Sequence, residues 1–148
     1  KGLVDQKNGG TAVAQRILRD CHTIAVVGLS PKPERDSYRV SAYMQAHGYR
    51  IIPVHPSASV VLGETAYPTL TAAAAAVRID LVNCFRRAED IPPIAAEAVR
   101  IGAQALWLQL GIVNDAALAS VRAQGLLAVQ DLCIKVEHAR GLRGRLHA

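Results

Sequence analysis

An apolar run begins at Thr23 and ends on Gly28, ahead of a loop that carries Ser30, Lys32 and Arg35. In α/β proteins a buried strand followed by such a loop and a helix presents backbone N–H groups to phosphate oxygens. This stretch therefore predicts a phosphate-binding loop.

The loop lacks the motifs of two common nucleotide sites. A nicotinamide-dinucleotide site would show G-x-G-x-x-G here, but no second glycine follows Gly28 at that spacing. The G-x-x-x-x-G-K-[ST] motif of nucleoside-triphosphate sites is absent as well. Ser37 is placed to cap the following helix. A solvated turn stiffened by Pro31 and Pro33 is the interpretation without a ligand.

A second apolar run ends at Val54 and leads into His55, with no acidic side chain beside it. Dehydrogenases usually place an acid here to bind the ribose diol. A neutral or cationic group instead tolerates a phosphate on the ribose, which an acid would repel. His55 therefore favours a ribose that carries phosphate, and a partly buried loop histidine is the alternative.

Polar groups also follow two later runs. Arg86 and Arg87 come directly after a strand, and the guanidinium fork suits phosphate oxygens. We expect one of them to face the ligand and the other to face solvent or Glu89. Further on, Gln109 can donate or accept hydrogen bonds and Gly111 permits close backbone approach, unless the segment is only a tight turn into the next helix.

The elements that must position these loops alternate between apolar runs and helical stretches. Further strands are expected at Tyr49–Val54, Ile79–Phe85, Gln104–Leu108 and Leu126–Val129, and helices at Thr11–Asp20, at Leu70–Val77 and in the stretch that contains Ile94, Ala98 and Ile101. Gly48, Gly102 and Gly125 precede three of the strands, where a helix C-cap favours positive φ. Strands apolar on both faces indicate a parallel sheet covered on both sides. We predict an α/β fold, a three-layer Rossmann-like domain with a five-stranded parallel sheet and helices on both faces.

The length of 148 residues and the apolar content of 51% fit one domain. We assign residues 1–22 to an N-terminal leader and helix, 23–140 to the nucleotide-binding domain, and 141–148 to a basic C-terminal tail. Basic side chains outnumber acidic ones by 17 to 12, which favours anionic partners. One Phe, one Trp and four Tyr are few for stacking on single strands, so nucleic acid is an unlikely partner.

Three widely spaced cysteines, Cys21, Cys84 and Cys133, match neither a disulfide framework nor a zinc site. Cys133, followed by Lys135, is either a reactive thiol or a buried small hydrophobe. No run approaches about 18 apolar residues, and no secretion signal is evident, so a soluble, cytoplasmic protein without a membrane span is expected. No catalytic constellation and no metal site are found in the sequence.

The spaced runs AVVGLS, PER-x-SYRV, GYRIIPVHP, LGETAYPTL, IDLVNCFRRAEDIPP, GAQALWLQLGI and DLCIKVEH stand in this order. Together they resemble the small stand-alone coenzyme A-binding proteins of bacteria. That family is similar to the N-terminal nucleotide-binding domain of the succinyl-coenzyme A synthetase α subunit. The resemblance covers roughly Cys21 to Arg140.

The resemblance implies coenzyme A as the ligand, which has a pyrophosphate and a 3′-phosphate on its ribose. By family position, it implies Gly28, Leu29, Ser30, Arg35 and Ser37 as the phosphate loop, His55 and Pro56 on the adenosine side, Phe85 and Arg86 beside the pyrophosphate, and Gln109 with Gly111 on the pantetheine side. The chain departs from the family where His55-Pro56 replaces the usual Asn-Pro and where Asp131-Leu132-Cys133 replaces the usual Asp-Arg-Cys.

These observations favour a non-catalytic binder of coenzyme A or acyl-coenzyme A that acts as a carrier, a sensor or the partner of an enzyme. The alternative is a nicotinamide-dinucleotide redox sensor or small oxidoreductase on the same fold. A third interpretation is a module that uses Arg140, Arg143 and Arg145 on nucleic acid. A homodimer through the N-terminal helix stays open.

Overall fold

Short apolar strands alternate with helices along residues 9–146, the part of the chain that the computed structural model describes. In chain order the elements are α2 (Thr11–Asp20), β1 (Thr23–Val27), α3 (Asp36–Ala46), β2 (Arg50–Val54), β3 (Val60–Val61), β4 (Glu64–Thr65), α4 (Leu70–Ala76), β5 (Leu81–Cys84), the 3-10 turn η1 (Ala88–Asp90), α5 (Ile91–Arg100), β6 (Ala105–Leu108), α6 (Asp115–Ala123), β7 (Leu127–Val129) and α7 (Ile134–Leu146). The predicted strands are confirmed, with ends that shift by one or two residues.

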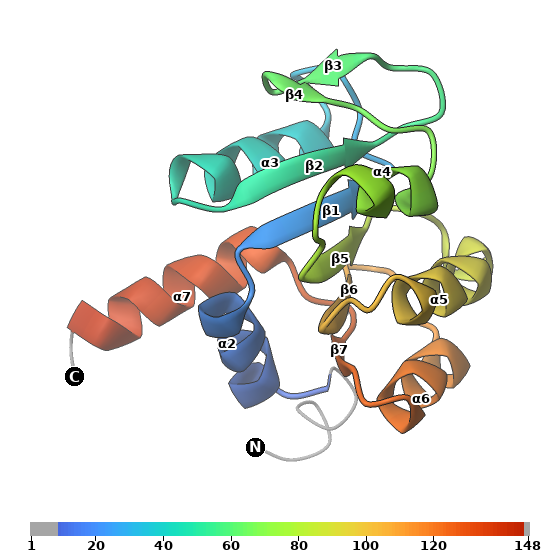
Figure 1. Cartoon of the computed structure of the whole chain (residues 1–148). Helices are drawn as coiled ribbons and strands as arrows, with labels where there is room; N and C mark the ends of the chain where they lie inside the picture. The colour runs from blue at the N-terminus through green and yellow to red at the C-terminus, as the bar shows by residue number, and fades with distance from the viewer. Residues whose placement is uncertain (1–8, 147–148) are drawn as a thin grey trace.

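Five strands form one parallel sheet in the order β2-β1-β5-β6-β7. Helices α2, α3 and α7 cover one face, and α4, α5 and α6 cover the other (Figure 1). The predicted three-layer Rossmann-like α/β fold is confirmed. From β1 the chain passes first to β2 on one side and then to β5 on the other. The carboxyl ends of these three strands therefore flank the switch point, where ligands bind in open α/β sheets.

The core consists of two apolar layers, one on each face of the sheet. Along β1, Ile24 and Val26 pack under α2, α3 and α7, whereas Ala25 and Val27 face the other layer. Successive side chains of a strand point to opposite faces, so a strand covered on both sides must be apolar throughout. The buried Trp107 of β6 donates from its Nε1 to the Leu132 carbonyl oxygen at 2.8 Å, which satisfies its polar atom.

Helix ends follow the sequence signals in several places. Gly48, Gly102 and Gly125 all have positive φ, at 95°, 76° and 94°, as the prediction of helix C-caps requires. The Thr69 hydroxyl caps α4 by accepting from the Ala72 N–H at 3.0 Å.

The C-terminal segment differs from the expectation. We expected residues 141–148 to form a basic tail, but α7 continues from Ile134 to Leu146. Ile134 is fully buried, and the ring Nδ1 of the buried His138 lies 2.9 Å from the Tyr43 hydroxyl of α3. Packing against α2 and α3 therefore holds a helix whose two glycines weaken it locally. The short hairpin of β3 and β4 was likewise not predicted.

Candidate functional site

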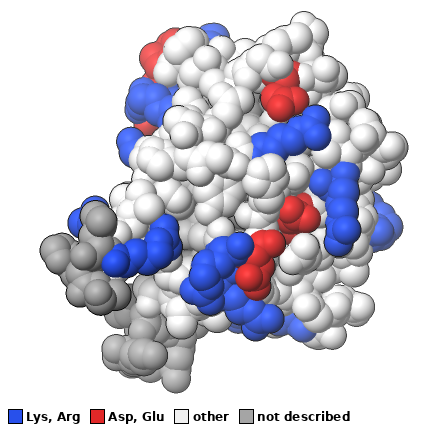
Figure 2. All heavy atoms as spheres, turned by 60° about the vertical axis from the view of Figure 1, so that its left-hand side comes forward, with Lys and Arg blue, Asp and Glu red and all other residues white. Residues whose placement is uncertain are grey.

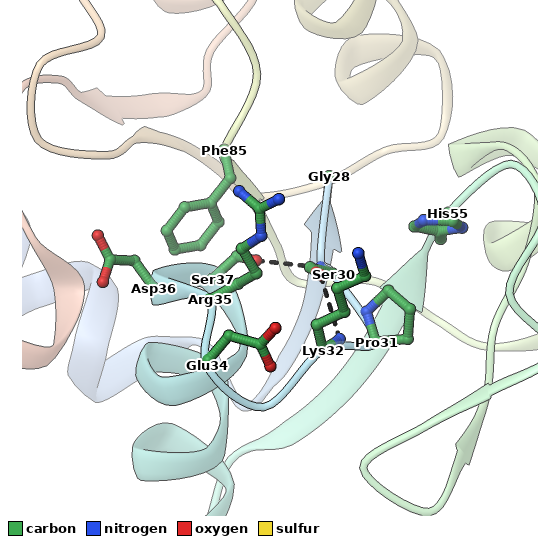
Figure 3. Close-up of a pocket in the computed structure, with 10 residues that line it drawn as sticks. All are labelled: Gly28, Ser30, Pro31, Lys32, Glu34, Arg35, Asp36, Ser37, His55 and Phe85. Carbon is green, nitrogen blue, oxygen red and sulfur yellow. Dashed lines mark hydrogen bonds between the residues drawn. The ribbon is translucent and has the colours of Figure 1, made fainter.

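An open cleft of about 670 Å³ lies at the carboxyl end of β1, where α3 begins (Figure 3). Its lining comes from the loop after β1, the first turn of α3 and the ends of β2 and β5. The lining residues are Gly28, Ser30, Pro31, Lys32, Glu34, Arg35, Asp36, Ser37, His55 and Phe85. Six of these belong to the site that the sequence implied: Gly28, Ser30, Arg35, Ser37, His55 and Phe85. We call this hollow the Gly28 cleft.

Gly28 forms the floor where the strands end. Its φ is +86°, and its N–H donates to the Val54 carbonyl oxygen at 3.1 Å. A Cβ atom at this position would lie 3.1 Å from the Phe85 carbonyl oxygen and 3.0 Å from Arg86 Cδ. Only glycine satisfies both the backbone conformation and the space. The Leu29 side chain is fully buried, so this residue offers the cleft only backbone.

The Ser37 side chain hydrogen-bonds to the loop after β1 and does not cap α3, so the predicted helix cap is wrong. It is a buried residue inside the first turn of α3, and its Oγ accepts from the Ser30 N–H at 3.0 Å. Ser30 Oγ in turn accepts from the Lys32 N–H at 3.1 Å. The loop is thereby held against the start of α3. N–H groups in the first turn of a helix have no intrahelical acceptor, so the start of α3 can donate to an anionic group.

Charges of both signs line the cleft. Lys32 and Arg35 form no ion pair with any described residue, and Figure 3 shows both side chains extending across the cleft. Of the two carboxylates, Asp36 forms an ion pair with Arg39, and its side chain is 83% exposed. The Glu34 carboxylate forms no ion pair with any described residue. Lys32 was noted in the sequence as a loop cation but not assigned to the site. Glu34 of the same loop and Asp36, the first residue of α3, were missed.

His55 reaches the cleft with one defined tautomer. Its Nδ1 accepts from the Ser57 N–H at 3.1 Å and from the Ala58 N–H at 2.9 Å, so Nδ1 carries no proton. The ring hydrogen therefore lies on Nε2, which is free to donate. Pro56 is exposed and is not among the residues that line the cleft. The end of β2 presents a donor, as the sequence indicated.

Arg86 lies on the other side of the sheet from its neighbour Phe85. It donates to Asp90 at 3.1 Å and lines a separate cavity of about 380 Å³ together with Val27 and Val54. The hydrogen bond from Arg86, with help from the charge of Arg87, holds the pKa of Asp90 below its usual value. The two cavities lie on opposite faces of the sheet. Each is lined by one residue from the end of β1, one from the end of β2 and one from the end of β5, and the residues of one cavity are the chain neighbours of those of the other. The expectation that one arginine faces the phosphates of this cleft is not met.

Gln109 and Gly111 do not line the Gly28 cleft. The Gln109 side chain is 3% exposed, donates to Asn83 Oδ1 at 2.6 Å and accepts from the Ile134 N–H at 3.4 Å. The Gly111 N–H donates to Asp131 Oδ1 at 2.7 Å. These contacts tie the loop after β6 to the segment before α7, and what the loop presents outward is Leu110, at 70% exposed.

The described residues contain no group of three metal-ligating side chains. Burial raises the pKa of Cys84 to about 12, and burial with the nearby Asp80 and Asp20 raises that of Cys21 to about 12. Cys133 is partly exposed. Among the described helices, none combines the length and the apolar character that crossing a membrane requires.

Residues 22–139 match the family of CoA binding domains. The chain belongs to this family. It is 42% identical, over 133 residues, to the uncharacterized protein YneT of Bacillus subtilis (strain 168), a match that spans 90% of this chain and 97% of YneT. A hypothetical protein from Pyrococcus horikoshii OT3 superposes with a TM-score of 0.82 at 33% identity, covering 88% of this chain and 90% of that one.

Larger enzymes contain the same fold. The apo form of a dinucleotide-forming acetyl-coenzyme A synthetase 1 from Ca. Korarchaeum cryptofilum superposes on this CoA-binding domain with a TM-score of 0.61 at 15% identity. The match covers 72% of this chain and 25% of that chain. At this identity the likeness shows the fold alone.

The Gly28 cleft of this CoA-binding domain has the donors that the phosphates of coenzyme A require. Lys32 and Arg35 supply unpaired cations, and the start of α3 supplies N–H groups. His55, at the end of β2, has a free Nε2 donor, and no acidic residue is next to it in the sequence. The residues present therefore fit the ligand of the family.

Proposed function

We propose that this domain binds coenzyme A or an acyl-coenzyme A in the Gly28 cleft and acts without catalysis, as a carrier, a sensor or the partner of an enzyme. The observation that carries the proposal is the presence of two cations without an ion-pair partner, Lys32 and Arg35, just before α3. They line the same cleft as Gly28, which follows β1 and has no side chain. This combination accommodates a pyrophosphate closely against the backbone.

The ribose side supports coenzyme A over NADH, whose adenosine ribose keeps a free diol. A ribose diol needs an acceptor at the end of β2, whereas His55 offers a donor from Nε2. A donor suits a phosphate on the ribose. A hydrogen bond to a charged phosphate contributes about 1.5 kcal/mol or more, which corresponds to roughly a tenfold change in affinity.

The polar groups of the cleft support binding without chemistry. The Ser30 and Ser37 hydroxyls both accept from backbone N–H groups of the same loop, and no histidine is paired with either. His55 uses Nδ1 for two backbone N–H groups. The cleft thus lacks the nucleophile–base pair that acyl transfer requires.

Isothermal titration calorimetry tests the proposal with coenzyme A, dephospho-coenzyme A, NADH and NADPH as ligands. We expect coenzyme A to bind about tenfold more tightly than dephospho-coenzyme A, and the reduced nicotinamides to bind weakly or not at all. Equal affinity for coenzyme A and its dephospho form contradicts the role assigned to His55. Tight binding of NADH or NADPH, with no binding of coenzyme A, would contradict the proposal. It would favour the nicotinamide-dinucleotide redox sensor or small oxidoreductase instead.

A pair of charge variants locates the site. Lys32→Gln with Arg35→Gln removes both unpaired cations, and we expect a loss of about 100-fold in coenzyme A affinity. The matched control pairs Arg78→Gln with Arg100→Gln, which remove the same charge from exposed positions outside the cleft. A similar loss in both variants would show that only net charge attracts the ligand.

A further inference from the structure

The stem of the Arg86 side chain passes the end of β1 at Gly28. Its Cδ and Cγ atoms lie 3.0 Å and 3.4 Å from the position that a Cβ atom on Gly28 would take. Gly28 lines the Gly28 cleft, whereas Arg86 lines the cavity of about 380 Å³ on the other face of the sheet. The Arg86 stem therefore adjoins the cleft at a residue that has no side chain.

One exposed contact holds the Arg86 guanidinium on that other face. Its Nη2 donates to Asp90 Oδ2 at 3.1 Å, and this side chain forms no other hydrogen bond or ion pair with a described residue. The Arg86 side chain is 46% exposed. Exposed ion pairs contribute little to stability, so the guanidinium can leave Asp90 at low cost.

Asp90 keeps a counter-charge when Arg86 leaves. Arg87 Nε lies 3.6 Å from the same Oδ2 atom of Asp90. Two arginines thus share one carboxylate, and one of them is enough to keep it paired. The strand end itself stays in place, because the Phe85 N–H donates to the Val27 carbonyl oxygen at 2.9 Å. The movement is therefore confined to the Arg86 side chain.

The ligand of the proposed function offers Arg86 a stronger partner. The pyrophosphate and the 3′-phosphate of coenzyme A together carry about four negative charges. Lys32 and Arg35, which line the cleft without an ion-pair partner among the described residues, balance only part of this charge. A guanidinium can donate two parallel hydrogen bonds to a phosphate, whereas Arg86 donates one to Asp90. A bound pyrophosphate therefore competes with Asp90 for Arg86.

We propose that coenzyme A recruits Arg86 as a phosphate ligand: the guanidinium leaves Asp90, turns past Gly28 into the Gly28 cleft and binds the pyrophosphate, while Arg87 stays with Asp90. The inference rests on the proposed function of the cleft. The missing side chain at Gly28 keeps the path open, since a Cβ atom there would lie 3.0 Å from Arg86 Cδ. Asp90 thus lowers the affinity for coenzyme A without touching it.

Calorimetry with coenzyme A on the full chain compares Arg86→Gln with Arg87→Gln. We expect Arg86→Gln to weaken binding about tenfold, because a charged hydrogen bond to the pyrophosphate is lost. Arg87→Gln removes the same charge from the next residue and should change the affinity by no more than about twofold. This control is needed because Lys and Arg side chains are spread over the face that Figure 2 turns forward, and each adds to the attraction of an anion. Equal losses in the two variants would show attraction by net charge alone and overturn the proposal.

Asp90→Asn tests the release of Arg86. The amide carries no charge and holds Arg86 less strongly, so we expect coenzyme A to bind about two- to fivefold more tightly. Glu89→Gln is the matched control, because Glu89 lines the same cavity but is paired with Arg87. It removes the same charge and should raise the affinity by less than about twofold. The melting temperature of each variant checks that it is folded.

The combination of the two exchanges decides whether Asp90 acts through Arg86. In the Arg86→Gln protein, Asp90→Asn should raise the affinity no more than Glu89→Gln does, because the side chain that Asp90 retains is gone. A two- to fivefold gain that persists without Arg86 would overturn the proposal. The absence of any gain in Asp90→Asn alone would overturn it as well.

Dephospho-coenzyme A separates this proposal from the role of His55. It keeps the pyrophosphate, so Arg86→Gln should weaken its binding by the same factor of about ten. An effect that disappears with dephospho-coenzyme A would assign Arg86 to the 3′-phosphate and overturn the proposal. If the parent protein does not bind coenzyme A, the proposed function fails. Titration with inorganic pyrophosphate then decides on Arg86: weakening by Arg86→Gln supports its role as a pyrophosphate ligand, and the absence of binding overturns it.

Discussion

Replacing Gly28 by alanine should destabilise the fold and weaken coenzyme A binding, since this position combines positive φ with close contacts. An L-residue at a φ of +86° costs roughly 1–2 kcal/mol. The new Cβ atom would also lie 3.1 Å from the Phe85 carbonyl oxygen. That carbonyl cannot retreat easily, because the Phe85 N–H donates to Val27 at 2.9 Å and fixes the strand end. Such crowding costs about 1–3 kcal/mol more.

Gly102→Ala is the matched control for this substitution. Its φ is +76°, so it carries a similar conformational cost, but nothing lies within 4 Å of its Cβ position. We therefore expect Gly28→Ala to lower the free energy of unfolding by about 2–4 kcal/mol and Gly102→Ala by about 1–2 kcal/mol. The difference between the two proteins isolates the contact with the strand ends.

Urea unfolding followed by the fluorescence of the buried Trp107 measures the stability difference, and calorimetry measures the affinity for coenzyme A. Gly28→Ala should lose at least about tenfold in affinity, because the strand ends that flank the cleft must separate. Gly102→Ala should bind normally. Equal loss of stability in the two variants would refute the reasoning about the Cβ contact. Normal coenzyme A binding by Gly28→Ala would refute the location of the phosphate site.

Thiol titration and pH dependence provide two further tests. Without denaturant, a disulfide reagent should modify only the partly exposed Cys133, because burial raises the pKa of Cys21 and Cys84 to about 12. Reaction of a second thiol in the folded protein would contradict the burial of these two cysteines. The pKa of His138 is lowered by burial first and then by nearby positive charges, so the unfolded chain binds the proton more readily than the folded one. Stability should therefore be constant above the ordinary value of 6.5 and fall as the pH decreases below it. In His138→Gln, whose amide can also hydrogen-bond to the Tyr43 hydroxyl, the free energy of unfolding should depend less on pH between about pH 5 and about pH 7.5, and an unchanged slope would assign the effect to other groups.

The strands and the loops at their carboxyl ends were predictable because each signal is local. An apolar run bounded by glycine predicts a buried strand wherever it lies in the chain. Positive φ at Gly48 and Gly102 follows from the position of each glycine after a helix and before a strand. The same local order placed Ser30, Arg35 and His55 at strand ends that a parallel sheet must bring to one edge.

The direction of individual side chains was less predictable. Phe85 lines the Gly28 cleft, whereas its neighbour Arg86 lines the cavity on the opposite face. Successive residues at a strand end face opposite sides of the sheet, and a strand apolar on both faces does not reveal which residue faces which side. Gln109 shows the same difficulty, since its amide is used internally by Asn83 and by the start of α7.

Sequence alone determined the class of fold, the order of its elements and the membership of a CoA-binding family, because these depend on composition and on spacing along the chain. Tertiary structure alone decided that α7 forms as a helix and that the Ser37 hydroxyl accepts from the Ser30 N–H. These features depend on contacts between residues far apart in the chain, which packing creates and which no local pattern encodes.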